Sequence, residues 1–289
     1  MKPLQIMFLV ENYLQQLNDI CIFYLDWFLG TRSIWVKTYG CSHNVSDSEY
    51  MEGILSSYGY RITEDQDNAD LWLVNSCTVK DPSQAAFMHL VNKAKEIHRP
   101  VVVAGCVSQA DRKIPGLDDV SVIGISQIDR VVEVVESTLQ GNNMKLLAKK
   151  ALPKLDLPKI RKNPLIEIIP LSTGCLGACT YCKTKHARGK LGSYSLEVLR
   201  ERVRSVVAEG VTEIWLSSED TGAYGIDLGT NIGELLRQLI AELPLNGKTM
   251  MRVGMTNPPY MLQHLEAIAG TYVTRMRMCC LVIVYVLCV

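Results

Sequence analysis

The chain has 289 residues, of which 48% are hydrophobic and 21% are charged, and its formal net charge at pH 7 is zero. This composition is typical of a soluble protein and leaves room for two domains. The length excludes the short secreted chains that depend on a disulfide framework. Ten cysteines, several in metal-like groups, favour a reducing compartment, and we expect a cytoplasmic location. The neutral net charge does not exclude nucleic acid as a partner, because the local distribution of charge decides that question.

Both ends of the chain are atypical. The apolar stretch 20–29 is short and only Lys2 precedes it with a positive charge, so we do not expect a secretory signal. The run from Cys279 to Val289 is uninterrupted and apolar but shorter than the ~20 residues of a membrane helix, so no membrane span is predicted. Its β-branched, uncharged character is typical of an aggregation-prone strand. The expected divisions are 1–32 as an extension, 33–141 and 164–270 as domains, 142–163 as a basic linker and 271–289 as a tail.

Short strands alternate with helices from Ser33 onward. The pattern predicts strands over 34–39, 70–75, 100–104 and 120–125, and helices over 45–58, 84–98 and 128–139. Strands that alternate with helices indicate an α/β domain with a parallel sheet.

Each of the first three predicted strands is followed directly by a cysteine. These are Cys41, Cys77 and Cys106, separated by 36 and 29 residues. The carboxyl ends of parallel strands share one edge of a sheet, so the three thiols are expected to converge there. Buried free cysteines are an alternative, since cysteine is among the most buried residue types. The identical placement favours an iron–sulfur site.

The predicted linker is strongly basic. Between Lys145 and Lys162 there are seven Lys or Arg residues and a single acid, and Pro153 and Pro158 stiffen the segment. Two interpretations remain open, a solvated linker and a contact with the RNA phosphate backbone, and we favour RNA contact.

The second domain contains a closely spaced cysteine motif. Cys175, Cys179 and Cys182 follow the predicted strand 165–171 and precede the predicted helix 195–209. Three thiolates leave one iron of a [4Fe–4S] cluster open, whereas clusters that only carry electrons usually have four cysteine ligands. Structural zinc is the alternative, but it prefers four ligands and no second cysteine pair lies nearby. In a βα barrel such a loop lies at the carboxyl end of the strands, where active sites are found.

Two further βα units are predicted in this domain. They comprise the strand 211–217 with the helix 231–243, and the strand 249–254 with the helix 261–268. The second domain is therefore expected to be an incomplete partial barrel of about three βα units.

The cysteine motif, with Tyr181 just before its last member, resembles the signature of radical S-adenosylmethionine (SAM) enzymes. The runs Thr-Tyr-Gly-Cys41-Ser-His-Asn, Leu-Val-Asn-Ser-Cys77-Thr-Val and Ala-Gly-Cys106 resemble the N-terminal domain of tRNA methylthiotransferases. The runs Cys-Lys-Thr-Lys-His-Ala-Arg-Gly, Ser-Ser-Glu-Asp-Thr-Gly-Ala-Tyr-Gly and Gly-Met-Thr-Asn-Pro-Pro-Tyr resemble its eukaryotic and archaeal branch. The resemblance covers about residues 34–270.

The resemblance implies methylthiolation of N6-threonylcarbamoyladenosine at tRNA position 37, at C2 of the adenine, with SAM and two [4Fe–4S] clusters. Cys175, Cys179 and Cys182 would hold the radical cluster, and Cys41, Cys77 and Cys106 an auxiliary cluster that carries or delivers sulfur. The implied partners are tRNA and an electron donor, and the sulfur source is not identified.

Further side chains are candidates for binding cofactor or RNA. The loop after the second barrel strand is expected to contact the methionine amino group of SAM through Ser218, Glu219 and Asp220, and Tyr181 to border its adenine. Solvated acids in a capped loop and a packed loop aromatic are the alternatives. Basic residues beside the radical motif are RNA candidates: Lys183, Lys185, Arg188 and Lys190.

The chain also departs from the family. The family has six βα units followed by a small RNA-binding TRAM domain, and its eukaryotic members have a C-terminal anchor to the endoplasmic reticulum membrane; we expect three units and no anchor here. Two other functions therefore stay open. One is a non-catalytic form that binds clusters or partners, and the other is a radical enzyme that inserts sulfur into a different substrate.

Overall fold

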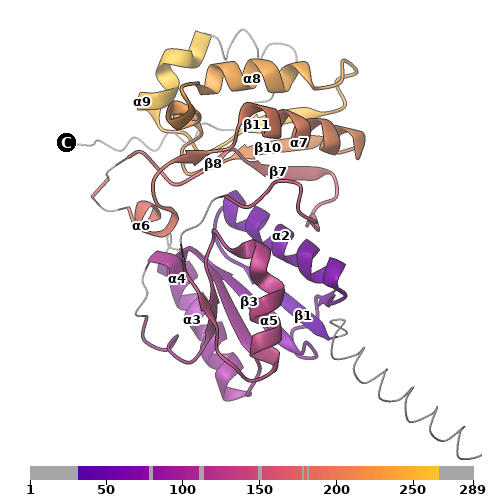
Figure 1. Ribbon diagram of the computed structural model, residues 1–289, viewed down its shortest axis with the longest axis vertical. Helices are drawn as coiled ribbons and strands as arrows, with labels where there is room; N and C mark the ends of the chain where they lie inside the picture. Colours follow the sequence, from indigo (N-terminus) through magenta and orange to yellow (C-terminus); the bar gives the residue numbers. More distant parts are fainter. Residues whose placement is uncertain are drawn as a thin grey trace, which may run out of the picture.

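The computed structural model describes residues 32–77, 81–110, 114–148, 152–177, 179–180 and 182–266. Two parallel sheets lie one above the other, the first drawn in indigo to magenta and the second in orange (Figure 1). The predicted α/β class with a parallel sheet is confirmed. The predictions for 1–31 and 267–289, and for Tyr181, lie outside the described residues.

The first sheet has the strand order β2-β1-β3-β4-β5-β6, and every neighbouring pair is parallel. Its strands are β1 (Ser33–Thr38), β2 (Arg61–Thr63), β3 (Leu71–Ser76), β4 (Val101–Gly105), β5 (Ser121–Ile123) and β6 (Lys145–Leu146). The sequence did not predict β2 and β6, because strands of two or three residues carry too little periodicity. β6 lies inside the segment expected to be a linker, so the first sheet extends beyond residue 141.

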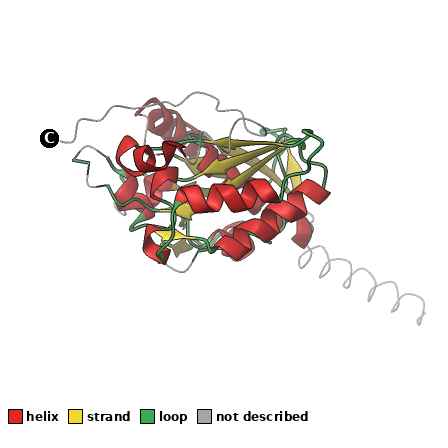
Figure 2. Cartoon of the chain, turned by 90° about the horizontal axis from the view of Figure 1, so that it is seen from above, coloured by secondary structure: helices red, strands yellow, loops and turns green. Residues whose placement is uncertain are grey.

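Helices cover both faces of the first sheet, which explains its continuous apolar strands. They are α2 (Ser42–Tyr58), α3 (Asp81–Glu96), α4 (Cys106–Ala110) and α5 (Val131–Leu139), with a 3-10 turn η1 (Ile128–Arg130) before α5. Alternate strand residues reach opposite faces: Ile34 packs in the cluster that contains α2 and α5, while Trp35 and Trp72 pack with α3. Seen from above, helices flank the strands (Figure 2).

The second sheet is three-stranded in the described part of the chain, in the parallel order β11-β10-β7. The first two expected units and the third strand are confirmed with slightly shorter bounds: β7 (Ile166–Pro170), α7 (Leu196–Ala208), β10 (Glu213–Ser217), α8 (Ile232–Ala241) and β11 (Met250–Val253). The helix expected over 261–268 is a correction: α9 (Pro258–Met261) ends where that helix was expected to begin, and a 3-10 turn follows it in the described residues. Ser195 and Asn231 cap α7 and α8 by accepting backbone N–H bonds.

Short elements surround the cysteine loop and the strand ends of the second sheet. They are the antiparallel pair β8 (Ser172–Thr173) and β9 (Gly192–Ser193), the helix α6 (Thr184–Arg188), and the 3-10 turns η2 (Thr221–Ala223), η3 (Ile226–Leu228) and η4 (Leu262–His264). None of the helices in the ranges given above is long and apolar enough to cross a membrane.

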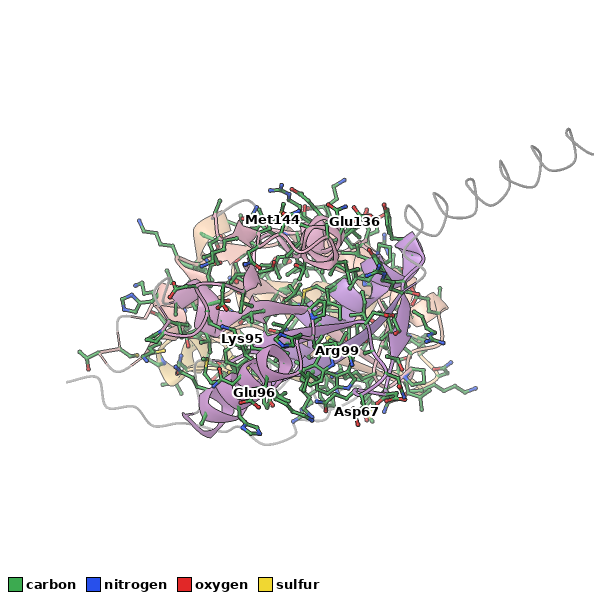
Figure 3. All side chains as sticks on the ribbon, turned by 90° about the horizontal axis from the view of Figure 1, so that it is seen from below. Asp67, Lys95, Glu96, Arg99, Glu136 and Met144 are labelled. Carbon is green, nitrogen blue, oxygen red and sulfur yellow. The ribbon has the colours of Figure 1, made fainter. Side chains whose placement is uncertain are left out.

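One apolar cluster runs from the first sheet through α2 to β7, β10, α7 and α8, so the two sheets share a core. Polar bonds reinforce this contact, since Ser46 Oγ in α2 donates to the carbonyl of Ile168 in β7 at 3.1 Å. At the opposite end of the first sheet, two basic side chains donate hydrogen bonds to loop carbonyls. Arg99 donates to the carbonyl of Asp67 and Lys95 to the carbonyl of Gly116. Figure 3 labels Arg99, Asp67 and Lys95. The contact with β7 holds the second sheet against α2, the helix that begins directly after Cys41.

Candidate cluster and cofactor site

Cys41, Cys77 and Cys106 lie at the carboxyl ends of β1, β3 and β4, which are neighbours in the sheet. Cys41 is the N-cap of α2 and Cys106 is the first residue of α4. Gly40 has a φ of +106°, and a Cβ added there would lie 2.5 Å from the sulfur of Cys77. The predicted convergence of these thiols thus depends on a glycine that lets one cysteine loop pass over another.

Within the first cysteine group Cys77 and Cys106 are buried and Cys41 is half-buried. Burial raises the pKa of the Cys106 thiol to about 12, against the opposing charge of Arg188. Burial likewise raises the pKa of Cys41, and the charge of Cys77 adds to that effect. The thiols are therefore near enough to sense one another, and deprotonation needs a cationic ligand to compensate the charge.

Cys175, Cys179 and Cys182 lie in the loop between β8 and α6 and are partly exposed. A Cβ added to Gly177 would lie 3.4 Å from the Cys175 sulfur and 3.7 Å from that of Cys179, so these sulfurs flank one backbone position. Gly177 N–H donates to the Cys175 sulfur at 3.3 Å. Burial raises the pKa of Cys175, and the nearby charges of Asp220 and Cys182 act in the same direction.

The donor chemistry of both groups fits iron–sulfur clusters. Within the described ranges no three His, Cys, Asp or Glu side chains surround a point as ligands of a single metal ion. A cubane cluster makes a different demand, because each thiolate binds a different iron and the sulfurs line a cavity. None of these six cysteines is in a disulfide. Two sets of three free thiols supply the type of donor that such clusters need.

Ser218, Glu219 and Asp220 follow β10 and have distinct surroundings. Both Asp220 carboxylate oxygens are used, since Oδ1 accepts from the N–H of Gly222 and of Asn257, and Oδ2 accepts from the Asn257 amide at 2.9 Å. Ser218 is fully buried and its Oγ accepts from the Asp220 N–H. Glu219 Oε1 lies beside His43 and the Arg188 guanidinium, while its buried Oε2 accepts no hydrogen bond from any described residue. Glu219 thus keeps one free acceptor atom.

The predicted RNA residues separate into exposed and buried ones. Lys183 and Lys190 are exposed beside the cysteine loop. Lys185 folds back on that loop and donates to the carbonyls of Leu176 and Gly177. Arg188 is buried, which corrects its prediction as an RNA contact: its guanidinium is bonded to protein groups.

The basic linker is also partly turned inward. Lys159 is 3.0 Å from Glu167 and 3.2 Å from Glu49, with its side chain only 3% exposed. Arg161 pairs with Glu167 and Glu209. These cations hold the linker against α2 and β7, so they are not available to RNA.

A buried polar cluster between the two cysteine groups was not foreseen. Arg188 Nη2 donates to Asn44 Oδ1 at 2.7 Å and to Asp47 Oδ2 at 2.8 Å, and Nε lies 3.0 Å from Glu219 Oε1. His43 Nδ1 is 3.1 Å from the same oxygen, an ion-pair distance without hydrogen-bond geometry. Burial opposes ionisation of Glu219, but His43 and Arg188 hold its pKa below the usual value. The run Cys-Ser-His-Asn after β1 was the available signal.

Two family models match the chain. Residues 33–120 match "Uncharacterized protein family UPF0004", and residues 169–278 match "Radical SAM superfamily". The first match covers the strands that carry Cys41, Cys77 and Cys106. The second contains the motif from Cys175 to Cys182.

Proteins named threonylcarbamoyladenosine tRNA methylthiotransferase are similar over most of this chain. The protein from Danio rerio is 57% identical over 244 residues, which is 82% of this chain and 44% of that protein. Those from Homo sapiens and Drosophila melanogaster are both 56% identical and cover 83% of this chain, or 42% and 45% of their own length. The chain belongs to the threonylcarbamoyladenosine tRNA methylthiotransferase family. It spans less than half the length of these relatives, so their activity and substrate enter below as proposals.

Solved structures agree with the fold. The radical S-adenosylmethionine methyltransferase TsrM from Kitasatospora setae, with tryptophan and a SAM analogue bound, has a TM-score of 0.55 and 12% identity, covering 85% of this chain and 58% of TsrM. The same enzyme with cobalamin and a [4Fe–4S] cluster has a TM-score of 0.54. At this identity the likeness concerns the fold alone. It supports the expected radical SAM architecture of the second sheet.

Proposed function

We propose that this chain provides the N-terminal domain and part of the radical domain of an enzyme that adds a methylthio group to C2 of N6-threonylcarbamoyladenosine at position 37 of tRNA. The observation that carries the proposal is the pair of three-cysteine groups at facing strand ends, joined by one buried ion network. The names of the relatives supply the substrate class.

The six cysteines are proposed to hold two iron–sulfur clusters. Cys175, Cys179 and Cys182 would hold the radical cluster and Cys41, Cys77 and Cys106 the auxiliary one. When bound, such a cluster supplies together with SAM the one-electron chemistry that replacing hydrogen on an aromatic carbon requires, because no side chain is a strong enough base. The protein's task is to hold these groups near each other and to exclude water from them.

The loop after β10 is proposed to receive the methionine end of SAM. Glu219 Oε2, buried and without a described donor, is the acceptor we assign to the methionine ammonium. Ser218 and Asp220 hold the loop in place through the bonds to Asp220 N–H and to Asn257. Tyr181 is proposed to border the cofactor's adenine.

We assign the tRNA contact to Lys183 and Lys190, which are exposed on the segment that carries the radical motif. Lys185 would act there by stiffening the loop. Electrons have to come from a separate reductant, and the sulfur source is not assigned. Thiols that bind clusters need a reducing compartment, which favours the cytoplasm.

Anaerobic reconstitution tests the cluster assignment. We expect about eight irons per chain, and about four after replacing either cysteine group by alanine. Mass spectrometry of tRNA nucleosides then tests the reaction, with the 2-methylthio product as the expected result. Full iron content without product would favour the non-catalytic alternative. Four irons in the unaltered chain would refute the auxiliary site.

A further inference from the structure

Arg188 lies in α6, just after the radical motif, and its side chain reaches the first cysteine group. Its Nε donates to the Cys106 sulfur at 3.3 Å. Its side chain is only 2% exposed. A buried cation is therefore fixed at hydrogen-bond distance from a thiol of the first cysteine group.

The surroundings of Arg188 hold its guanidinium in that position. Asn44 and Asp47 accept from Nη2, and Glu219 lies beside Nε. A planar guanidinium can satisfy several acceptors at fixed angles, whereas the point charge of a lysine cannot. An arginine guanidinium is not deprotonated in proteins, and Asp47 and Glu219 supply opposite charge beside it. The positive charge is thus permanent, and its orientation is fixed by three elements.

We propose that Arg188 is a positioning residue that sets the reduction potential of the auxiliary cluster held by Cys41, Cys77 and Cys106. The inference rests on the proposed function, since it assumes a cluster at these thiols. Hydrogen bonds to the ligand sulfurs and nearby charge are among the factors that set cluster potentials. Reduction adds a negative charge, which a buried cation stabilises with little screening by solvent. Arg188 therefore raises the potential of this cluster.

Arg188 also connects the proposed auxiliary cluster to the second sheet, through its contact with Glu219 after β10. Glu219 shares Oε1 with Arg188 and His43, and its Oε2 is the atom assigned above to the methionine ammonium. Because Glu219 and Cys106 both lie beside Arg188 Nε, a change in the charge of Glu219 alters the total electrostatic field at Cys106. The auxiliary cluster is therefore expected to sense events at the loop after β10.

The experiment isolates the auxiliary cluster in the full chain by replacing Cys175, Cys179 and Cys182 with alanine. After anaerobic reconstitution, iron content is measured and the potential is determined by a titration with dithionite followed by electron paramagnetic resonance. Arg188→Gln should lower the reduced-to-oxidised ratio at a given potential about tenfold, which is ~59 mV for one electron. Arg188→Lys, which keeps a charge but not the fork, should give a smaller fall in the same direction. Lys190→Gln, an exposed cation two residues on, should give none.

The outcomes separate the inference from the proposed function. About four irons with an unchanged potential in Arg188→Gln and Arg188→Lys would overturn the role of Arg188 alone. Absence of iron from the parent variant would overturn the auxiliary site and the inference with it. Arg188→Gln leaves two buried carboxylates without their partner, which costs stability. Arg188→Lys, and Arg188→Gln combined with Asp47→Asn, restore the charge balance in part and decide the question by the same ratio.

Discussion

Ser42 and Ser217 share a hydrogen bond of 2.8 Å between their hydroxyl oxygens although they are 175 positions apart in the chain. Ser42 follows Cys41 at the start of α2, and Ser217 is the last residue of β10. The bond joins the strand-end edge of the first sheet to that of the second. The start of α2, next to Cys41, thus lies against the end of β10, although each sheet could be recognised separately in the sequence.

A double-mutant cycle should measure this connection. Ser42→Ala and Ser217→Ala together should cost less than the sum of the single changes, with a coupling energy of about 0.5–1.5 kcal/mol, because the second change removes no further bond. Denaturant unfolding of the four proteins gives the energies. Ser42→Ala combined with Ser205→Ala, whose hydroxyl bonds Glu209 instead, should be additive within about 0.5 kcal/mol. Additivity at Ser42 and Ser217 would contradict the proposed contact.

Glu167 should be a strong determinant of stability. Its side chain is fully buried in β7 and faces Lys159, Arg161 and Arg202. Glu167→Gln removes the buried counter-charge that these three cations share, so we expect a loss of about 3–5 kcal/mol in the free energy of unfolding. Urea unfolding measures it. The matched control is Glu234→Gln in α8, which pairs with the exposed Arg237 and should leave the midpoint unchanged.

The same glutamate should make the protein sensitive to acid. Burial opposes its charge, but Lys159 and Arg202 hold the pKa of Glu167 below the usual value. A depressed pKa contributes stability above the unfolded value and loses it as pH falls through the folded one. Unfolding at pH 7 and pH 3 should therefore show a smaller acid-induced loss in Glu167→Gln than in the parent.

Gly40→Ala should disrupt the first cysteine group. The left-handed backbone costs about 1–2 kcal/mol for a residue with a Cβ, and the methyl group would also collide with Cys77. We expect a larger loss of stability than strain alone gives, together with iron content reduced to about four per chain. Gly210→Ala is the control, because its φ is +83° with nothing within 4 Å of the added Cβ. That variant should show the strain alone and full iron content.

Glu52 should give the stability a second dependence on pH, with a sign opposite to that expected for Glu167. Burial raises the pKa of Glu52 from 4.5 to about 7, since the nearby Lys162 only partly compensates. A raised pKa gives stability that is present below pH 4.5 and is lost as pH rises to about 7. Glu52→Gln should therefore be more stable than the parent at pH 8, by about 2–3 kcal/mol, and equal to it at pH 4. Thermal or urea unfolding at both values tests this. Glu96→Gln, at an exposed position of α3 (Figure 3), should follow the parent at both.

The regular elements were largely predictable because their signals are local. The pattern of apolar residues predicted β1, β3, β4 and the helices that follow them. The cysteine that follows each of these strands could be read directly from the sequence. The caps Ser195 and Asn231 fixed where α7 and α8 begin. The short strands β2 and β6 escaped because their pairing partner, rather than their own sequence, makes them strands.

The charged residues were the part that sequence reasoning misplaced. Lys159, Arg161 and Arg188 read as basic surface, because a run of cations is usually solvated. Lys159 and Arg188 each pair with a carboxylate of α2 that lies far earlier in the chain, Glu49 and Asp47 respectively. No periodicity in one segment reports a partner more than a hundred residues away.

The sequence by itself determined the parallel α/β class, the two groups of three cysteines and the family, since spacing along the chain is enough for each. Only the tertiary structure decided which side chains lie between those groups. Arg188 is an internal cation rather than an RNA contact because α2 packs on β7 and α4 on α6, and this packing brings Asn44, Asp47, Cys106 and Glu219 within its reach. Burial then makes each of these charges depend on the others, which is a property of the packed molecule and of no single segment.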